Sequence, residues 1–131
     1  MQLKRIDHIG VIVDNLADAS TLLEQGFGLT PVPGTSRPDL RTVFFRCGDV
    51  SIEVIEISDP ETRQARLGEG QRARIEHIAF EVEDLNQTLE ALAALGVQPT
   101  APPRMSGSYL TFWTNPDSSD GVMYQFLQRG F

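Results

Sequence analysis

The chain contains the same short pattern twice, and this internal repeat restricts its fold more than any other feature. Arg5-Ile6-Asp7-His8-Ile9 returns as Arg74-Ile75-Glu76-His77-Ile78, an offset of 69 residues (77 − 8). At the same offset, Asp14-Asn15-Leu16 matches Glu83-Asp84-Leu85. Two copies of about 60 residues are too few for a solenoid, which needs at least three units. We therefore expect a fused pair of half-domains.

Within each copy, hydrophobic periodicity and breaker residues predict a strand, a helix and then further strands. The first copy reads as a strand over 5–13, a helix from Asn15 to Gly26 or Gly28, a proline-rich loop over 31–38, and strands over 42–47 and 51–57 joined at Gly48-Asp49. The second reads as a strand over 75–82, a helix from Asp84 to Gly96, a loop at Pro99, Pro102 and Pro103, and strands over 109–114 and 122–127. With a short strand after each helix, the order is β-α-β-β-β.

These elements predict an α+β protein made of two tandem βαβββ modules. The first module spans about 4–58, a polar linker with one helical turn spans about 59–73, and the second module spans about 74–130. In the first strand of each module, one face is apolar, and we expect it to pack on that module's own helix. The histidine faces the other way, and a small residue, Gly10 or Ala79, follows two places later.

Composition excludes several classes of protein. The 131 residues carry 11 basic and 18 acidic side chains, a formal net charge of −7, so we expect no nucleic-acid partner. No stretch approaches the roughly 18 uninterrupted apolar residues of a transmembrane helix, and the N-terminus lacks a signal-peptide pattern. We therefore expect a cytoplasmic protein without a membrane partner. The single cysteine, Cys47, excludes an internal disulfide, and we expect it to be a small buried hydrophobe.

Two symmetric pairs of side chains are the candidate ligands of a metal ion. The chain has two histidines, His8 and His77, and both occupy the same repeat position. Two neutral imidazoles that converge about a pseudo-twofold axis are a natural beginning for a metal site. The last strand of each copy adds Glu53 and Gln125, an offset of 72 residues (125 − 53) because the second hairpin is longer. A carboxylate amid apolar residues is costly unless it is paired or metal-bound.

Two other acids receive simpler interpretations. Glu56 alternates with Glu53 along the strand, and we expect its side chain to face water on the opposite side of the sheet. Glu81 shares a face with His77, and the sequence leaves open whether it supports the metal site or is exposed to solvent.

The paired βαβββ pattern resembles the vicinal oxygen chelate superfamily, which includes glyoxalase I, methylmalonyl-CoA epimerase, extradiol dioxygenases, and fosfomycin and bleomycin resistance proteins. The resemblance covers essentially the whole chain. It is carried by Ile6-Asp7-His8-Ile9-Gly10-Val11, Ile52-Glu53-Val54-Ile55-Glu56, Glu76-His77-Ile78-Ala79-Phe80 and Gly121-Val122-Met123, which are most similar to the epimerase and glyoxalase I branches. The fold that the resemblance implies is a glyoxalase-like incomplete barrel with a metal-binding cleft.

The resemblance also implies roles for named residues. His8, Glu53, His77 and Gln125 fall on the four metal-ligand positions of the family, for a divalent ion such as Zn, Ni, Co, Mn or Fe. The fourth position usually holds a glutamate that can act as a base, and Gln125 cannot take up a proton. Glu53 is then the candidate base. The epimerases carry a separate glutamate in the loop before the third strand, and in this loop Asp39 is the nearest acid.

The leading functional hypothesis is a metal-dependent isomerase, epimerase or lyase that acts on a small carbonyl substrate through a metal-stabilised enolate. One alternative is a non-haem iron dioxygenase, since His8, His77 and Glu53 provide two histidines and a carboxylate. The other is a non-catalytic protein that sequesters a drug or metabolite. We also expect a homodimer, because each half-sheet has an open edge that needs covering.

Overall fold

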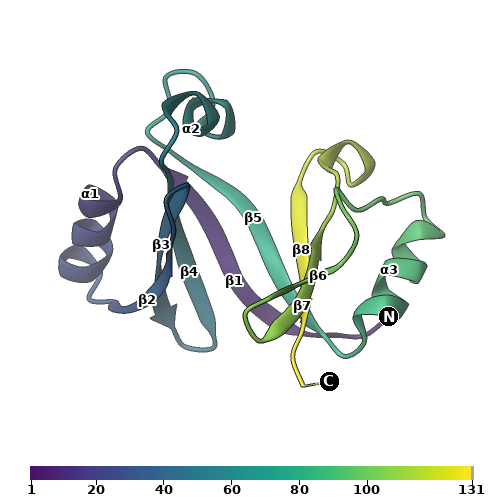
Figure 1. Ribbon diagram of the computed structural model, residues 1–131. Helices are drawn as coiled ribbons and strands as arrows, with labels where there is room; N and C mark the ends of the chain where they lie inside the picture. Colours follow the sequence, from purple (N-terminus) through teal and green to yellow (C-terminus); the bar gives the residue numbers. More distant parts are fainter. Residues whose placement is uncertain (131) are drawn as a thin grey trace. The chain divides into compact units, whose positions relative to one another are not determined.

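The computed structural model describes residues 1–130 and divides into two compact units (Figure 1). One unit comprises residues 8–76, and the other combines residues 1–7 with the chain from His77 onward. The opening residues of the first strand therefore group with the second copy of the repeat. The strand order of the mixed sheet is β2-β3-β4-β1-β5-β8-β7-β6.

The first copy of the repeat forms the predicted β-α-β-β-β series. Its elements are β1 (Leu3–Val13), α1 (Leu16–Thr21) continued by a π-helical turn over Leu22–Gly26, β2 (Thr30–Ser36), β3 (Leu40–Cys47) and β4 (Val50–Ile57). β1 pairs with β4 in parallel, and β3 pairs with β4 in antiparallel fashion. The predicted turn at Gly48-Asp49 is confirmed, because Cys47 pairs with Val50 and Gly48 has a φ of 63°.

The second copy repeats this order. Its elements are β5 (Ala73–Val82), α3 (Leu85–Ala93), β6 (Arg104–Ser106), β7 (Tyr109–Trp113), a short 3₁₀ turn over Pro116–Ser118, and β8 (Met123–Gln128). β5 pairs with β8 in parallel, and β7 pairs with β8 and β6 in antiparallel fashion. The repeat read from the sequence is therefore a repeat of structure.

The proline-rich segment after the first helix is largely a strand, where the sequence predicted a loop over 31–38. β2 includes Pro31, Pro33 and Gly34 and pairs with β3. Proline is tolerated there because β2 lies at the edge of the sheet, where a missing N–H breaks no inner ladder. A Cβ on Gly34 would lie 2.2 Å from Thr42 Oγ1, so this position needs a residue without a side chain.

The helices begin at the residues that the sequence indicates. Asn15 accepts a hydrogen bond from the Asp18 N–H, and Asp84 accepts one from the Gln87 N–H. These side chains satisfy N–H groups that the first turn of a helix leaves without partners.

A second residue at each helix start is contributed by the last strand of the same copy. The Leu16 N–H donates to Glu56 Oε2 at 2.8 Å, and the Leu85 N–H donates to Gln128 Oε1 at 2.8 Å. The expectation that Glu56 faces water is therefore wrong. The Leu16 hydrogen bond lowers the pKa of Glu56, and its ion pair with Arg41 acts in the same direction.

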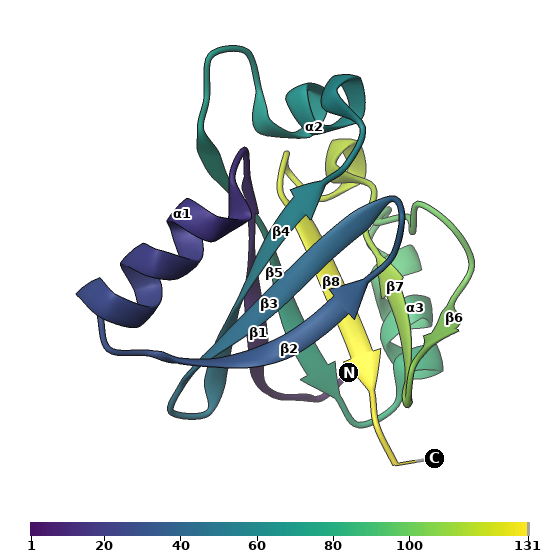
Figure 2. The same cartoon turned by 60° about the vertical axis from the view of Figure 1, so that its left-hand side comes forward.

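The predicted packing of one strand face on the module's own helix is confirmed in both copies. Val11 and Val13 of β1 pack with Leu16, Ala19 and Leu23 of the first helical segment. In the second copy, the corresponding cluster combines β5, α3, β7 and β8 through Phe80, Val82, Leu85, Leu89, Leu92, Phe112 and Phe126. In Figure 2, α1 lies to the left of strands β1 and β4.

The linker forms a longer helix than the single turn that the sequence predicts. α2 (Pro60–Leu67) begins at Asp59, whose side chain accepts from the Thr62 N–H. Leu67 then packs on Ile12, Ile55 and Ile57 of the same unit. These three residues continue the face of β1 and β4 that carries His8 and Glu53, so α2 covers one end of that face.

Two further findings concern the expectations about membrane-spanning segments and the single cysteine. No helix within residues 1–130 is both long and apolar enough to cross a membrane. Cys47 is exposed at the end of β3, so the expectation that it is buried is wrong. The hairpin turn directly after Cys47 leaves little structure to cover it.

Candidate functional site

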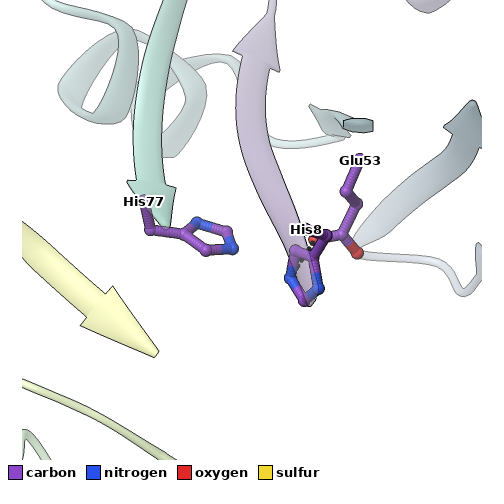
Figure 3. A group of neighbouring side chains, drawn as sticks. All are labelled: His8, Glu53 and His77. Carbon is purple, nitrogen blue, oxygen red and sulfur yellow. Dashed lines mark ion pairs between the residues drawn. The ribbon is translucent and has the colours of Figure 1, made fainter. Parts of the chain in front are cut away.

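His8 and Glu53 come together on adjacent strands of the unit formed by residues 8–76. In the β1–β4 register, Gly10 lies opposite Glu53, and both share a sheet face with His8. Because Gly10 has no side chain, the carboxylate of Glu53 can extend towards His8. His8 Nε2 lies 3.5 Å from Glu53 Oε1, and the two side chains are 3% and 16% exposed (Figure 3).

This separation fits two ligands of one metal ion. It is longer than the 2.7–3.2 Å of an ordinary N–H···O hydrogen bond. Two ligand atoms, each about 2.1 Å from an ion and at a tetrahedral angle to one another, lie about 3.4 Å apart. The His8–Glu53 spacing is thus suited to a shared cation.

An aromatic ring fixes one side of this pair. Phe44 faces Glu53 in the β3–β4 register, and its ring lies edge-on to the His8 imidazole at a centroid distance of 5.8 Å. Phe44 shares the sheet face of His8 and Glu53, whereas its neighbour Phe45 is fully buried among the residues that pack on the first helix.

The other unit positions His77 and Gln125 in the same way. Ala79 lies opposite Gln125 in the β5–β8 register, and His77 shares their face two residues before Ala79. Ala79 therefore stands where Gly10 stands in the first copy, and the small residue again leaves room beside the side chain from the last strand. His77 and Gln125 are 4% and 2% exposed.

A buried hydroxyl determines which atom of the Gln125 amide is the donor. Thr111 Oγ1 donates its one proton to the Phe126 carbonyl at 2.7 Å. It can then only accept from Gln125, whose Nε2 lies 3.1 Å away. The amide nitrogen is thereby directed to Thr111, and the carbonyl oxygen is directed away from it. The sequence pattern gives no sign of this role of Thr111, because the role depends on the pairing of β7 with β8.

Asp39 lies away from His8 and Glu53 in the same unit. It directly precedes β3, and the residue after it, Leu40, pairs with Ile57, whereas Glu53 pairs with Phe44. The Asp39 side chain is 69% exposed and binds Arg37 through two hydrogen bonds of 3.0 and 3.3 Å. Its exposure and its partner are those of a surface ion pair.

Glu81 is neither exposed nor a lone carboxylate beside His77. It is 8% exposed and pairs with Arg5 at 3.0 Å, with Arg129 at 3.5 Å and with Lys4 at 3.8 Å. Arg129 also donates to Asp7 at 2.7 Å. Burial opposes the charge on Arg129, but Asp7 and Glu81 outweigh burial and raise its pKa. These pairs join the N-terminal and C-terminal strands of one unit.

The donor set has the chemistry of a site for a divalent transition metal. Neutral imidazole nitrogens suit Zn, Cu, Fe and Ni, and carboxylate and amide oxygens are harder ligands that complete a mixed N/O set. The residues of this chain therefore fit such an ion.

Comparison with known proteins gives a family and a fold. A family model described as the Glyoxalase/Bleomycin resistance protein/Dioxygenase superfamily matches residues 5–126. The uncharacterized protein YqjC of Bacillus subtilis (strain 168) is 25% identical over 130 residues, which cover 96% of this chain and 93% of that protein.

Solved structures agree over nearly the whole chain. Methylmalonyl-CoA epimerase from Mycobacterium tuberculosis matches with a TM-score of 0.86 and 18% identity, over 99% of this chain and 91% of that one. The hypothetical protein BH1468 from Bacillus halodurans C-125 matches with a TM-score of 0.82 and 22% identity, over 97% and 95%. These likenesses confirm the predicted α+β fold.

Proposed function

Because the chain belongs to the glyoxalase/bleomycin resistance protein/dioxygenase superfamily, we propose that it is a metal-dependent isomerase or epimerase of a small carbonyl compound. The proposed ligands of the divalent ion are His8, Glu53, His77 and Gln125. One observation carries this proposal. His8 Nε2 and Glu53 Oε1 lie 3.5 Å apart in one unit (Figure 3), and His77 and Gln125 occupy the equivalent, buried positions of the other unit.

The reaction class follows from the donor set and from the solved relatives. A divalent ion at these residues would supply Lewis acidity, which polarises a substrate carbonyl and acidifies the neighbouring C–H bond. Methylmalonyl-CoA epimerases are among the structures that share this fold, and this supports proton transfer at a carbon atom as the chemistry. A lyase reaction of the glyoxalase I kind uses the same proton transfer.

Glu53 is the residue that we propose as the base. It is a carboxylate beside His8, whereas Gln125 at the equivalent position has an amide that accepts no proton. Its 16% exposure leaves the side chain accessible to a small substrate. Asp39 is the second candidate, but its pairing with Arg37 and its place at the start of β3 make it the weaker one.

Replacing Glu53 by glutamine separates its role as a base from its role as a ligand. Glu53→Gln keeps an oxygen ligand and removes the proton acceptor, so we expect metal content to be retained and turnover to fall by about 10²–10⁴-fold. His8→Ala should instead lower metal occupancy. Methylglyoxal–thiol adducts and 2-methyl-branched acyl-CoA esters are the substrates to screen first. Unchanged turnover in Glu53→Gln would show that the base lies elsewhere, and Asp39→Asn is then the next variant.

The same residues favour a second candidate function. Two histidines and one carboxylate are the ligand set of non-haem iron dioxygenases, and His8, His77 and Glu53 would provide these side chains. Oxygen consumption by the iron-loaded protein with a catechol would support this function over isomerisation. Tight binding of a drug or metabolite without turnover in either assay would instead indicate a sequestering protein.

A further inference from the structure

Arg104, which is exposed, and Trp113, which is half-buried, form a pair on neighbouring strands of one unit. The guanidinium carbon of Arg104, on β6, lies 5.1 Å from the centroid of the Trp113 ring, on β7. A cation at this distance over an indole is held by the negative face of the ring. Trp113 therefore restricts where the Arg104 side chain lies, although that side chain is exposed.

The strand register puts this pair on the sheet face that carries Gln125. Arg104 lies opposite Thr111, and Trp113 lies opposite Gln125. Residues directly opposite one another in an antiparallel pair share a face, as do Thr111 and Trp113, which are two apart in one strand. The hydrogen bond between Gln125 and Thr111 agrees with this placement.

Within residues 1–130, no carboxylate forms an ion pair with the Arg104 guanidinium. Arg129 provides the contrast, since it lies 5.3 Å from the Tyr109 ring but also binds Asp7 and Glu81. Arg104 is thus a cation without an acidic partner among the described residues, on the sheet face that carries Gln125.

We propose that Arg104, held by Trp113, binds an anionic oxygen group of the substrate, either a carboxylate or a phosphate. The inference rests on the proposed function, because it assigns a substrate class to that site. A guanidinium presents its donors in the plane of the group. A ring that occupies its face leaves these in-plane N–H groups available to two oxygens of one anion, in the bidentate geometry that carboxylates and phosphates favour.

The single tryptophan of the chain makes anion binding measurable without turnover. Tryptophan emission is recorded during titration with inorganic phosphate and, separately, with malonate, each at an ionic strength matched with sodium chloride. The variants are Arg104→Gln, Arg104→Lys, and the control Arg72→Gln. Arg72 is also exposed and without an acidic partner among the described residues, but it lies in the segment before β5.

We expect a saturable change in emission for the wild type and for Arg72→Gln. Arg104→Gln should weaken binding by about ten- to hundredfold, the loss that corresponds to removal of a charge-assisted hydrogen bond. Arg104→Lys should bind with intermediate affinity, because lysine keeps the charge but lacks the planar fork. The probe that binds more tightly distinguishes a phosphate site from a carboxylate site.

Equal dissociation constants for the wild type and Arg104→Gln would overturn the proposal, as would the absence of saturation with both probes. These results are separable from failure of the proposed function. If His8→Ala loses its metal while Arg104→Gln binds the anion as tightly as the wild type, the anion site is refuted and the metal site is not. Anion binding that depends on Arg104, in a protein that retains no metal, would refute the metal-dependent reaction alone.

Discussion

Thr111→Val removes a hydroxyl that is fully buried and replaces it with a methyl group of similar size. The wild-type hydroxyl makes two hydrogen bonds, to the Phe126 carbonyl and from the Gln125 amide. A net contribution of about 0.5–1.5 kcal/mol each predicts a loss of about 1–3 kcal/mol in the free energy of unfolding. Urea denaturation measures this loss directly.

The same substitution has a second effect that a purely structural hydroxyl would not have. Without Thr111 Oγ1, the Gln125 amide is no longer oriented, so its oxygen is presented to a metal ion less often. Loss of such a supporting partner typically costs about 10–100-fold in metal affinity. Titration with Co²⁺ or Zn²⁺ by calorimetry tests this expectation, and Thr111→Ser should retain most of the affinity because it keeps the hydroxyl.

Thr42→Val is the matched control, because Thr42 occupies the position equivalent to Thr111 in the first copy. Thr42 Oγ1 accepts a hydrogen bond from the Thr35 N–H at 2.8 Å. The counterpart of Gln125 in that copy is Glu53, which lies opposite Phe44 and whose carboxylate has two equivalent oxygens. Thr42→Val should therefore lower stability and leave metal affinity unchanged. Equal metal affinities for Thr111→Val and the wild type would show that Thr111 does not orient the Gln125 amide for a metal ion.

Two further predictions concern the helix starts and the assembly. Glu56→Ala should lower stability by about 0.5–2 kcal/mol at neutral pH. Because the pKa of Glu56 is lowered below its ordinary 4.5, the stabilisation from its charge is complete above that pH and is lost as the pH falls through the lowered folded-state value. The difference in the free energy of unfolding between Glu56→Ala and the wild type should therefore be smaller in acid. The corresponding difference for Gln128→Ala, which removes a neutral amide, should not change with pH. Urea titrations at pH 7 and pH 3 measure both differences. The protein should also be a homodimer, and light scattering that shows a monomer at micromolar concentration would contradict this.

Much of the fold could be predicted because its signals are local. Asn15 and Asp84 begin helices, Gly48-Asp49 turns a hairpin, and alternation separates the histidine face from the helix face. The same alternation, applied to both copies, puts His8 and His77 at equivalent positions. None of these inferences requires knowledge of which strands are neighbours.

The features that the sequence did not reveal depend on contacts between distant segments. Glu56 binds the Leu16 N–H across 40 residues, so its own strand pattern gives no sign of this bond. The burial of Glu81 depends on arginines from both ends of the chain. The prolines of β2 indicate a loop by composition, and only the position of that strand at the sheet edge makes them compatible with pairing.

We propose that His8, Glu53, His77 and Gln125 bind one divalent metal ion. The most direct test of this proposal is the metal content of protein purified without added metal or chelator, measured by elemental analysis for the wild type, His8→Ala and His77→Ala. We predict one divalent ion per chain in the wild type, with substantial loss in each histidine variant. In a crystal structure, the ion should lie about 2.0–2.2 Å from its nitrogen and oxygen ligands. Wild-type protein without a stoichiometric metal, or variants that keep the full metal content, would show that these residues do not form a metal site.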